Sequence, residues 1–235
     1  MKLTEVLDAI RSYGTASTKN TLMKHGAREP LYGAKVADLK VLQKKIKKDV
    51  PLALALFDSG VYDARYLAAL IANGAEMTEA QLQHWVNTSN SPGISEYSVP
   101  WVASEHPKGW EMALEWIESD SELIAGSGWN TLGGIVSMKT DEELDIPSLK
   151  KLLKRIEKDI HTAPNRVRYV MNGFVISVGA YVDALHDLAV ETARKIGTVS
   201  VDMNGTACKV PGAEAYIAAA RNRPGGAKKK KTIKC

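Results

Sequence analysis

The sequence predicts an all-α protein, organised as a solenoid of stacked antiparallel helix pairs, with one small β-hairpin over about 199–210. Apolar residues recur at intervals of three or four along most of the 235-residue chain, which is typical of amphipathic helices. Helix–turn–helix units begin near residues 62, 95, 127 and 166, so their starts are 33, 32 and 39 residues apart. Repeats of this length are typical of α-solenoids, in which each pair buries its apolar face against its neighbours. An irregular helical bundle is the alternative that this pattern leaves open.

The predicted helices follow the same spacing from the N-terminus onward. In the first, over MKLTEVLDAIRSYG, one face carries the apolar residues Leu3, Val6, Leu7 and Ile10. Further helices are predicted over 35–48, 62–73, 76–87, 107–118, 147–160, 166–180 and 183–196. Thr78 and Gln81 form the pattern of a capping box at the start of one of them. Glycine and proline residues separate these segments, as expected of turns between helices.

The β-hairpin is predicted from VSVDMNGTACKVP, residues 199–211, because no other segment alternates convincingly with a period of two. Asn204-Gly205 fits a two-residue type I′ turn, since both central residues of that turn need a positive φ. The register that this turn sets gives one apolar face, made of Val199, Val201, Met203, Cys208 and Val210. A lone two-stranded ribbon is marginal in water, so we expect this face to rest on helices or on a ligand.

Composition predicts a cytoplasmic protein with no cofactor, no metal and no membrane span. No run of 18 apolar residues occurs, and the N-terminus lacks the apolar core of a signal peptide. The two cysteines, Cys208 and Cys235, suggest no disulfide framework, and no Cys or His cluster has the spacing of a zinc site. The stretch GSGWNTLGG lacks the spacing of a dinucleotide-binding loop.

Positive charge is concentrated at the C-terminus. The net charge is +4, and residues 221–235 carry seven Lys and Arg residues and no acidic residue, which leaves 4 − 7 = −3 for residues 1–220. We therefore predict a single helical domain over 1–222, followed by a basic flexible tail over 223–235. A tail of this kind is suited to contacting phosphates without reading a sequence.

Three stretches in the N-terminal half resemble a known superfamily. They are LYGAKVADLKVLQKKIKKD at 31–49, LALALFDSGVYDARYLAALIA at 52–72 and MTEAQLQHWVNT at 77–88. In this order they resemble the AlkD-like DNA alkylation repair proteins, and the similarity extends over residues 1 to about 197. The resemblance implies a HEAT-like, armadillo-like helical repeat fold that binds DNA in a concave basic groove. It also implies that active relatives remove positively charged N-alkylated purines.

The residues at the superfamily's active-site positions differ in this chain. Active members carry a tryptophan followed four residues later by an aspartate, and these places hold Pro92 and Glu96. The superfamily's arginine in the next repeat falls near Gly126, and its later groove tryptophan near Gly173. Only a carboxylate remains, unless Tyr97, Trp101 or Trp129 take the places of the missing groups. With its expected hairpin, the chain therefore resembles the branch of the AlkF and AlkG type, which binds branched DNA without detected excision.

The resemblance and the basic residues together predict a DNA-binding protein that recognises damaged or branched DNA without efficient base excision. One alternative is a DNA glycosylase that releases cationic purines of the 3-methyladenine or 7-methylguanine type, with Glu96 as the catalytic carboxylate. A carboxylate there would stabilise an oxocarbenium-like sugar. A second alternative is a protein-interaction solenoid. We expect DNA, whether duplex, damaged or branched, to be the partner of a monomer.

The candidate DNA-binding residues are those suited to phosphate contact or to base stacking. Lysines neutralise phosphates, and asparagine and arginine at a helix start offer donors to them. The set comprises Lys35, Lys40, Trp101, Trp129, Asn165, Arg166, Arg168, Asn172, Lys209, Lys228, Lys229, Lys230 and Lys231. For the lysines the alternative is a solvated outer face. For the asparagines and arginines it is hydrogen bonding between repeats, and for the tryptophans it is a place in the core.

Overall fold

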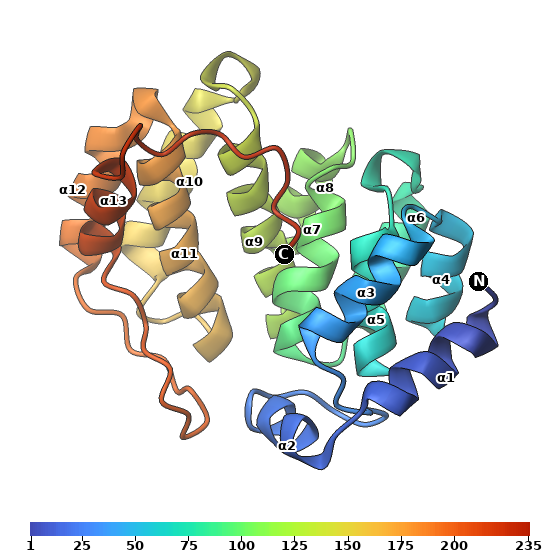
Figure 1. Cartoon of the computed structure of the whole chain (residues 1–235). Coiled ribbons are helices and arrows are strands. Elements are labelled where there is room, and N and C mark those ends of the chain that lie inside the picture. The colour runs from blue at the N-terminus through green and yellow to red at the C-terminus, as the bar shows by residue number, and fades with distance from the viewer. The chain divides into compact units, whose positions relative to one another are not determined.

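A computed structural model describes the whole chain, residues 1–235, and its regular structure is entirely helical (Figure 1). This confirms the predicted helical architecture. The α-helices are α1 (Leu3–Tyr13), α2 (Ala16–Lys24), α3 (Val36–Ile46), α4 (Val50–Asp58), α5 (Tyr62–Ile71), α6 (Glu79–Thr88), α7 (Val99–Ala103), α8 (Gly109–Trp116), α9 (Glu122–Met138), α10 (Ile146–Asp159), α11 (Asn165–Tyr181), α12 (His186–Ile196) and α13 (Ala213–Arg221). The connections contain the 3-10 helices η1 (Gly74–Glu76), η3 (Asp141–Glu143) and η4 (Asp183–Leu185), and the π-helix η2 (Ile94–Ser98).

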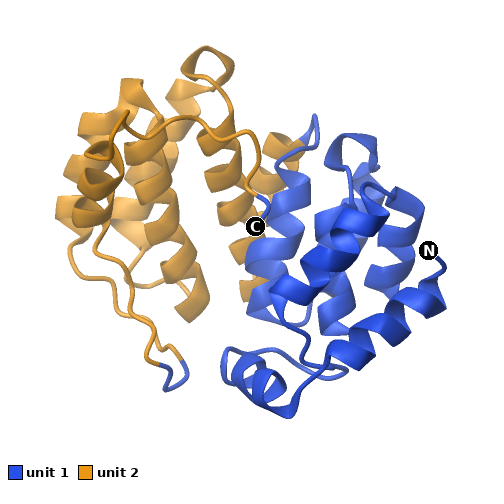
Figure 2. Cartoon of the chain, viewed as in Figure 1, with its two compact units in different colours: residues 1–108, 204–206, 234–235 blue, residues 109–203, 207–233 orange.

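The contacts within the chain divide it into two compact units (Figure 2). Unit 1 comprises residues 1–108, 204–206 and 234–235. Unit 2 comprises residues 109–203 and 207–233. The single helical domain expected over 1–222 stays a prediction. The division into units describes contacts in the folded chain, and a single domain would show itself by the two units unfolding together.

Helices with a clear apolar stripe were predictable, whereas α4 was not, because it is apolar on most of its surface. Its sequence VPLALALFD buries Leu52, Ala53, Leu56 and Phe57, so no polar face marks its period. Its start is nevertheless marked, because the side chain of Asp49 accepts a hydrogen bond from the N–H of Leu52 at 3.0 Å.

Unit 1 is organised around α5, whose polar side chains support the neighbouring connections. Asp63 is 1 % exposed, and its carboxylate accepts hydrogen bonds from the backbone N–H groups of Tyr32, Gly33 and Ala34 at 2.7, 3.3 and 2.8 Å. Buried backbone groups need such partners, since an unsatisfied N–H costs about 1 to 3 kcal/mol. Asp63 therefore fixes the connection that leads into α3.

Arg65, on the same helix, donates hydrogen bonds to backbone carbonyl groups of two neighbouring helices. It is 8 % exposed, and it donates from Nε to the carbonyl of Phe57 at 3.1 Å and from Nη1 to the carbonyl of Thr88 at 2.9 Å. Its guanidinium carbon also lies 4.9 Å from the centre of the Phe57 ring. The ends of α4 and α6 are thus tied to α5 by one side chain.

Unit 2 is organised around α9 and α11. Trp129 is fully buried and meets Phe174 edge-on, with 5.4 Å between the ring centres. A Cβ at Gly128 would lie 2.8 Å from the carbonyl oxygen of Ala113, so glycine permits α8 and α9 to approach closely. No single helix of the chain has both the length and the apolar character to cross a membrane. Only the bent pair of α11 with residues 183–196 meets that test, by length and composition.

The predicted β-hairpin over 199–210 is wrong, because the structure contains no β-strand. Its turn is present, with φ of 54° at Asn204 and 67° at Gly205, but the two arms form no ladder (Figure 1). The first arm is held instead by α11: the amide of Asn165 donates to the carbonyl of Asp202 at 2.9 Å and accepts from its N–H at 2.7 Å. Val199 is buried in the core of unit 2, while Cys208 is exposed. Packing and side-chain bonds to helices outweigh the small stability of an isolated ribbon.

Replacing Asp63 by alanine is expected to lower the free energy of unfolding by about 4 kcal/mol, because three N–H groups lose their acceptor at about 1 to 3 kcal/mol each before relaxation. Urea unfolding of the full chain, followed by circular dichroism, measures the loss. Asp8→Ala is the matched control. The Asp8 side chain is 73 % exposed, and solvent screens its ion pair with Arg11. Equal stabilities of the two variants would contradict the role given to Asp63.

Candidate nucleic-acid interface

The predicted DNA-binding side chains on α11 are hydrogen-bonded within unit 2. Arg168 donates from Nη1 to the carbonyl of Ser200 at 3.2 Å and from Nε to the carbonyl of Ala163 at 2.7 Å. Asn172, which is 1 % exposed, donates to the carbonyl of Pro211 at 2.8 Å. With Asn165, these side chains anchor the segment 199–211 onto α11. Their use for DNA stays a prediction, and it requires that these bonds be exchanged for bonds to phosphate.

Arg166 begins the same helix and links three parts of unit 2. Its backbone N–H donates to the carboxylate of Glu122 at 2.5 Å, which satisfies one donor of the helix start. Its guanidinium carbon lies 4.5 Å from the centre of the Tyr169 ring, and Nη1 donates to the sulfur of Met203 at 3.6 Å. Arg166 is half-buried, and among the candidate DNA-binding residues on α11 it is the one whose guanidinium stacks on an aromatic ring.

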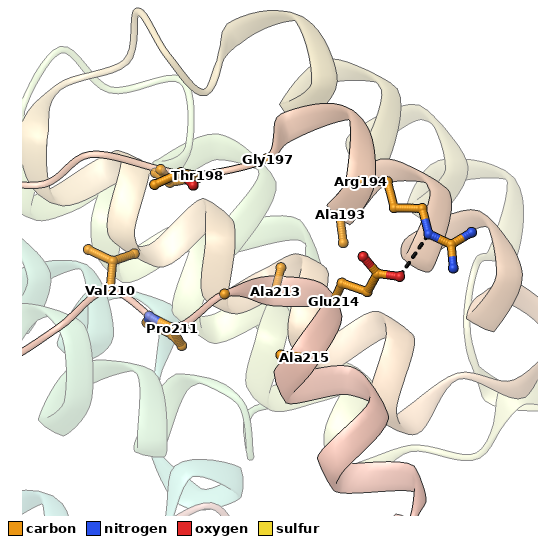
Figure 3. A pocket seen from close by; sticks show the side chains of 11 residues that line it. Ala193, Arg194, Gly197, Thr198, Val210, Pro211, Ala213, Glu214 and Ala215 are labelled. Carbon is orange, nitrogen blue, oxygen red and sulfur yellow. Dashed lines mark hydrogen bonds and ion pairs between the residues drawn. The ribbon is translucent and has the colours of Figure 1, made fainter.

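A cavity of about 560 Å³ opens where the segment 199–211 leaves α12 and enters α13 (Figure 3). Val199 and Val210 line it from the two ends of the segment, and Arg194 and Glu214 form an ion pair at its edge, with 2.8 Å between Nε and Oε1. The remaining lining residues are small: Ala193, Gly197, Thr198, Pro211, Gly212, Ala213 and Ala215. Its one cation is already paired with a carboxylate, so this cavity carries no surplus positive charge for a phosphate.

Trp129 lines a second cavity in unit 2, of about 310 Å³. Its indole is fully buried, and the guanidinium carbon of Arg155 lies 5.9 Å from the ring centre. Arg155 is in turn paired with both carboxylate oxygens of Glu118. For Trp129 the sequence left a place in the core open as the alternative to a DNA contact. Trp129 lies in the core and also lines this cavity.

Glu96 and Trp101 lie in unit 1, on η2 and α7. Glu96 is 2 % exposed and Trp101 is 7 % exposed. Trp101 meets Tyr66 edge-on at 5.2 Å and lies 6.4 Å from Tyr97, measured between ring centres. Tyr97 is 42 % exposed, so this aromatic cluster of Tyr66, Tyr97 and Trp101 reaches the surface through Tyr97. Single-turn π-helices such as η2 are frequent at functional sites.

The predicted lysines outside the tail lie at the surface. Lys35 is exposed at the N-cap of α3, Lys40 is half-buried on that helix, and Lys209 is exposed on the second arm of the segment 199–211. Lys44 and Lys45 are exposed in the last turn of α3, and Lys48 is exposed just beyond it. Apart from Lys48, whose ammonium donates to the carbonyl of Ala72 at 2.6 Å, these groups are available to phosphate without rearrangement, unlike the donors on α11.

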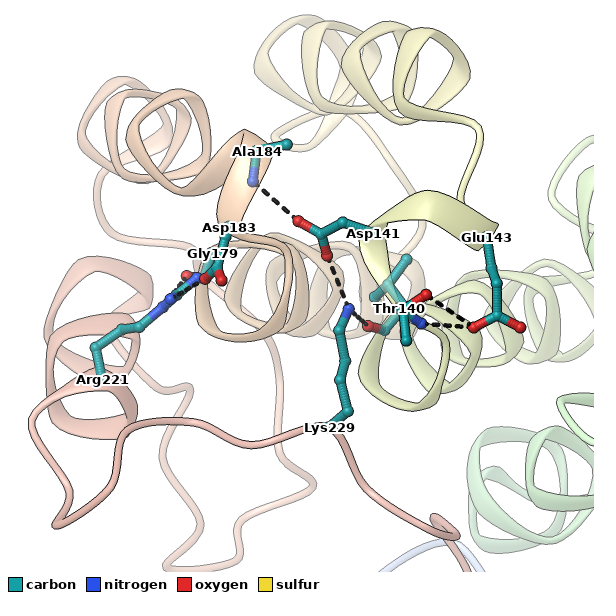
Figure 4. A network of polar contacts seen from close by, with 9 residues as sticks. Thr140, Asp141, Glu143, Gly179, Asp183, Ala184, Arg221 and Lys229 are labelled. Atoms are coloured by element: carbon teal, nitrogen blue, oxygen red, sulfur yellow. Dashed lines mark hydrogen bonds and ion pairs between the residues drawn. The ribbon is translucent and has the colours of Figure 1, made fainter.

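The tail lysines fall into two classes. Lys228 and Lys231 are exposed, whereas Lys229 is half-buried and its ammonium lies 3.1 Å from the carboxylate of Asp141 (Figure 4). Burial alone would raise the pKa of Asp141, but the N–H of Ala184 and the Lys229 ammonium outweigh burial and hold that pKa below its usual value. Lys230 is exposed, and its ammonium lies 5.1 Å from the centre of the Tyr181 ring.

Sequence reasoning missed the partners of these groups. Tyr66 joins Trp101 only through folding, whereas the sequence had offered Tyr97 and Trp101 separately as replacements for the family's aromatic groups. Asp141 lies within the capping box formed by Thr140 and Glu143, which is a local signal for a helix start and gives no sign of a lysine partner. No group of three or more His, Cys, Asp or Glu side chains is arranged to hold a metal ion.

Comparisons with known proteins agree along nearly the whole chain. A family model described as "DNA alkylation repair enzyme" matches residues 3–206. An uncharacterised protein of Listeria monocytogenes is 35 % identical over 213 residues, which are 88 % of this chain and 92 % of that protein. An uncharacterised protein of Listeria innocua is 33 % identical over 213 residues with the same coverage.

A solved structure is similar over 100 % of this chain and 100 % of its own, with a TM-score of 0.91 and 28 % sequence identity. It is described as representing a new family of proteins related to the HEAT-like repeat DNA glycosylases, with affinity for branched DNA structures. This similarity supports an all-helical HEAT-like fold for the present chain. It also agrees with the superfamily that the three N-terminal stretches indicated.

Replacing Asn165 by alanine is expected to free the segment 199–210 while the helices stay folded, because the amide of Asn165 holds both backbone groups of Asp202. Loss of two hydrogen bonds, at about 1 kcal/mol each, should speed amide hydrogen exchange at Asp202 by about tenfold or more. Asn222→Ala, at an exposed position after α13, is the control. Unchanged exchange at Asp202 would show that packing alone holds the segment.

Proposed function

The chain belongs to the DNA alkylation repair enzyme family, and from this premise we propose that it binds branched or damaged DNA without efficient base excision. The observation that carries the proposal is the similarity over the full length to a structure described as having affinity for branched DNA. The two chains are 28 % identical and match over the full length of each, with a TM-score of 0.91.

The charges of the chain support a polyanionic partner. Exposed lysines stand at the start of α3, on the segment 199–211 and in the tail, represented by Lys35, Lys209 and Lys228. Each lysine that neutralises a phosphate releases condensed counterions, and this term provides affinity without sequence preference. The exposed Tyr97 adds an aromatic face at the surface of unit 1, and such faces stack on unpaired bases at junctions and damaged sites.

The surroundings of Glu96 support the absence of efficient excision. A carboxylate that stabilises a cationic sugar must approach within a few ångströms of it. Glu96 is only 2 % exposed, and by the resemblance the family's first aromatic position falls at Pro92, its arginine near Gly126 and its later tryptophan near Gly173. Excision with Glu96 remains the second candidate, because this carboxylate lies on a π-helical turn beside the aromatic cluster.

Gel-shift titration of three-way, four-way and linear DNA of equal length tests the proposed function. We expect the branched forms to bind about tenfold more tightly than the duplex at the same salt concentration, which corresponds to about 1.4 kcal/mol. Charge alone does not produce this difference, so the control is an unrelated protein of net charge +4. Binding no tighter than that of the control would exclude a nucleic-acid role and favour a protein-interaction solenoid.

A base-release assay on methylated DNA separates binding from excision. We expect the wild-type chain and Glu96→Gln to release no base above background, while both retain their affinity for branched DNA. If the wild-type chain releases methylated purines and Glu96→Gln is slower by about 10²-fold or more, Glu96 acts chemically and the protein is a glycosylase. Glu79→Gln, at an exposed position on α6, is the matched control.

A further inference from the structure

Lys234, next to the last residue of the chain, occupies a built cation site in unit 1. Its side chain is only 6 % exposed. The ammonium lies 2.8 Å from a carboxylate oxygen of Glu105 and donates to the carbonyl of Ala72 at 2.7 Å. Burying an ammonium is costly unless it is paired and hydrogen-bonded, and both conditions are met here.

The site uses the C-terminal end of α5. Ala72 is the C-cap of that helix, where unsatisfied carbonyls and the helix dipole favour positive charge. The carboxylate of Glu105 also accepts a hydrogen bond from the N–H of Gly74 at 3.1 Å, which orients it beside the helix end. A helix terminus, a positioned carboxylate and a buried ammonium thus meet at one point.

A second ammonium competes for the same carbonyl. Lys48 donates to the carbonyl of Ala72 at 2.6 Å, so the ammonium groups of Lys48 and Lys234 share one carbonyl, and Lys234 also pairs with Glu105. Burial, with a smaller contribution from the neighbouring Lys48, lowers the pKa of Lys234 to about 8 against the opposing attraction of Glu105. The surplus positive charge makes this contact releasable and leaves the pair of lysines suited to an anion.

The tail has another anchor within unit 2. The ammonium of Lys229 pairs with Asp141 and donates to the carbonyl of Val136 at 3.0 Å (Figure 4). The backbone N–H of Lys230 donates to the carbonyl of Ser137 at 2.8 Å. In each anchor a carboxylate holds an ammonium that a phosphate would otherwise bind.

We propose that the C-terminal residues are an internal ligand of this protein, held by Glu105 and Asp141, and that a phosphate polymer displaces them by binding the same ammonium groups. An ammonium paired in a buried site cannot neutralise a phosphate at the same time, so docking and polyanion binding oppose each other. The docked terminus also contacts Tyr66, which hydrogen-bonds to Cys235 and packs against Trp101. Displacement therefore uncovers one side of the aromatic cluster. The part of this inference that concerns DNA rests on the proposed function.

Amide hydrogen exchange tests the docking in the absence of any DNA. Glu105→Gln with Asp141→Asn removes both carboxylate charges and keeps the oxygen acceptors. We expect the amide of Lys230 to exchange about tenfold faster in this double variant than in the wild-type chain. The matched control is Glu79→Gln with Glu191→Gln, which changes the net charge equally at ion pairs that do not involve the tail. Equal exchange at Lys230 in the two double variants would overturn the proposal, whatever the protein binds.

Affinity measurements test the competition. We expect the Glu105→Gln, Asp141→Asn variant to bind a four-way DNA junction about tenfold more tightly than the control variant. This factor corresponds to a tail that is undocked in about one tenth of the wild-type molecules, because only those molecules can bind with the tail. The slope of log affinity against log salt should steepen by about 0.9 for each additional phosphate that the released lysines neutralise. Removing residues 224–235 should abolish the whole difference. A difference that survives the truncation, or no difference, would refute competition by the tail.

Heparin chromatography separates this inference from the proposed function. Heparin is a linear polyanion, so it competes for the tail lysines without requiring recognition of DNA. If no DNA form binds the wild-type chain but the double variant still elutes from heparin at higher salt than the control variant, the proposed function fails and the internal ligand stands. Should Glu105→Gln not fold, Asp141→Asn against Glu191→Gln repeats both measurements with one anchor. Identical elution of the variants would contradict the inference.

Discussion

The connections between helices carry backbone N–H and carbonyl groups that no helix satisfies, and buried or half-buried polar side chains on two helices satisfy them. On α5, Asp63 accepts from three consecutive N–H groups, and Arg65 donates to the carbonyls that end two other helices. On α11, Asn165 and Asn172 hold the two arms of the segment 199–211. Because an orphaned buried group costs as much as a well-packed side chain contributes, these few residues fix where the connections run.

Because backbone groups of the connections need partners, the polar residues of this protein fall into two groups: those bonded to the backbone and those at the surface. Donors that the sequence suggested for phosphate, such as Arg168 and Asn172, are engaged with protein carbonyls. Groups at the surface include Lys209, on the segment that Arg168 and Asn172 hold, and Tyr97, on η2 of unit 1. A substitution on α11 therefore acts on a ligand in two ways, by removing a donor and by releasing the segment that it holds. Only a measurement of segment mobility distinguishes the two.

Local signals in the sequence were reliable for helices and for the superfamily, and less so for everything that depends on distant contacts. Periodicity predicted α10 and α11 nearly to their ends, because one buried stripe per helix is a property of the helix itself. Asn204-Gly205 correctly predicted a turn with two positive φ angles, but a ladder depends on how each arm packs, and α11 decided that. The partners of the tail are 129 and 93 residues distant, at Glu105 and Val136, so no spacing rule could find them. Glu96 was singled out by resemblance alone, and its burial could not be read from its neighbours in sequence.

Preference for branched DNA, if the proposed function holds, cannot come from the tail. Lysine contacts to phosphate neutralise charge on any nucleic acid, and they strengthen binding to duplex and junction alike. Discrimination requires groups with fixed positions that meet unpaired bases or the geometry of a branch point. The candidates that the proposed function offers for this role are the half-exposed ring of Tyr97 beside the buried Trp101, and the segment anchored by Asn165. A tail that docks on carboxylates when no polyanion is present would therefore lower the affinity for nucleic acids in general, and its last residue beside Tyr66 would also cover one side of the aromatic cluster.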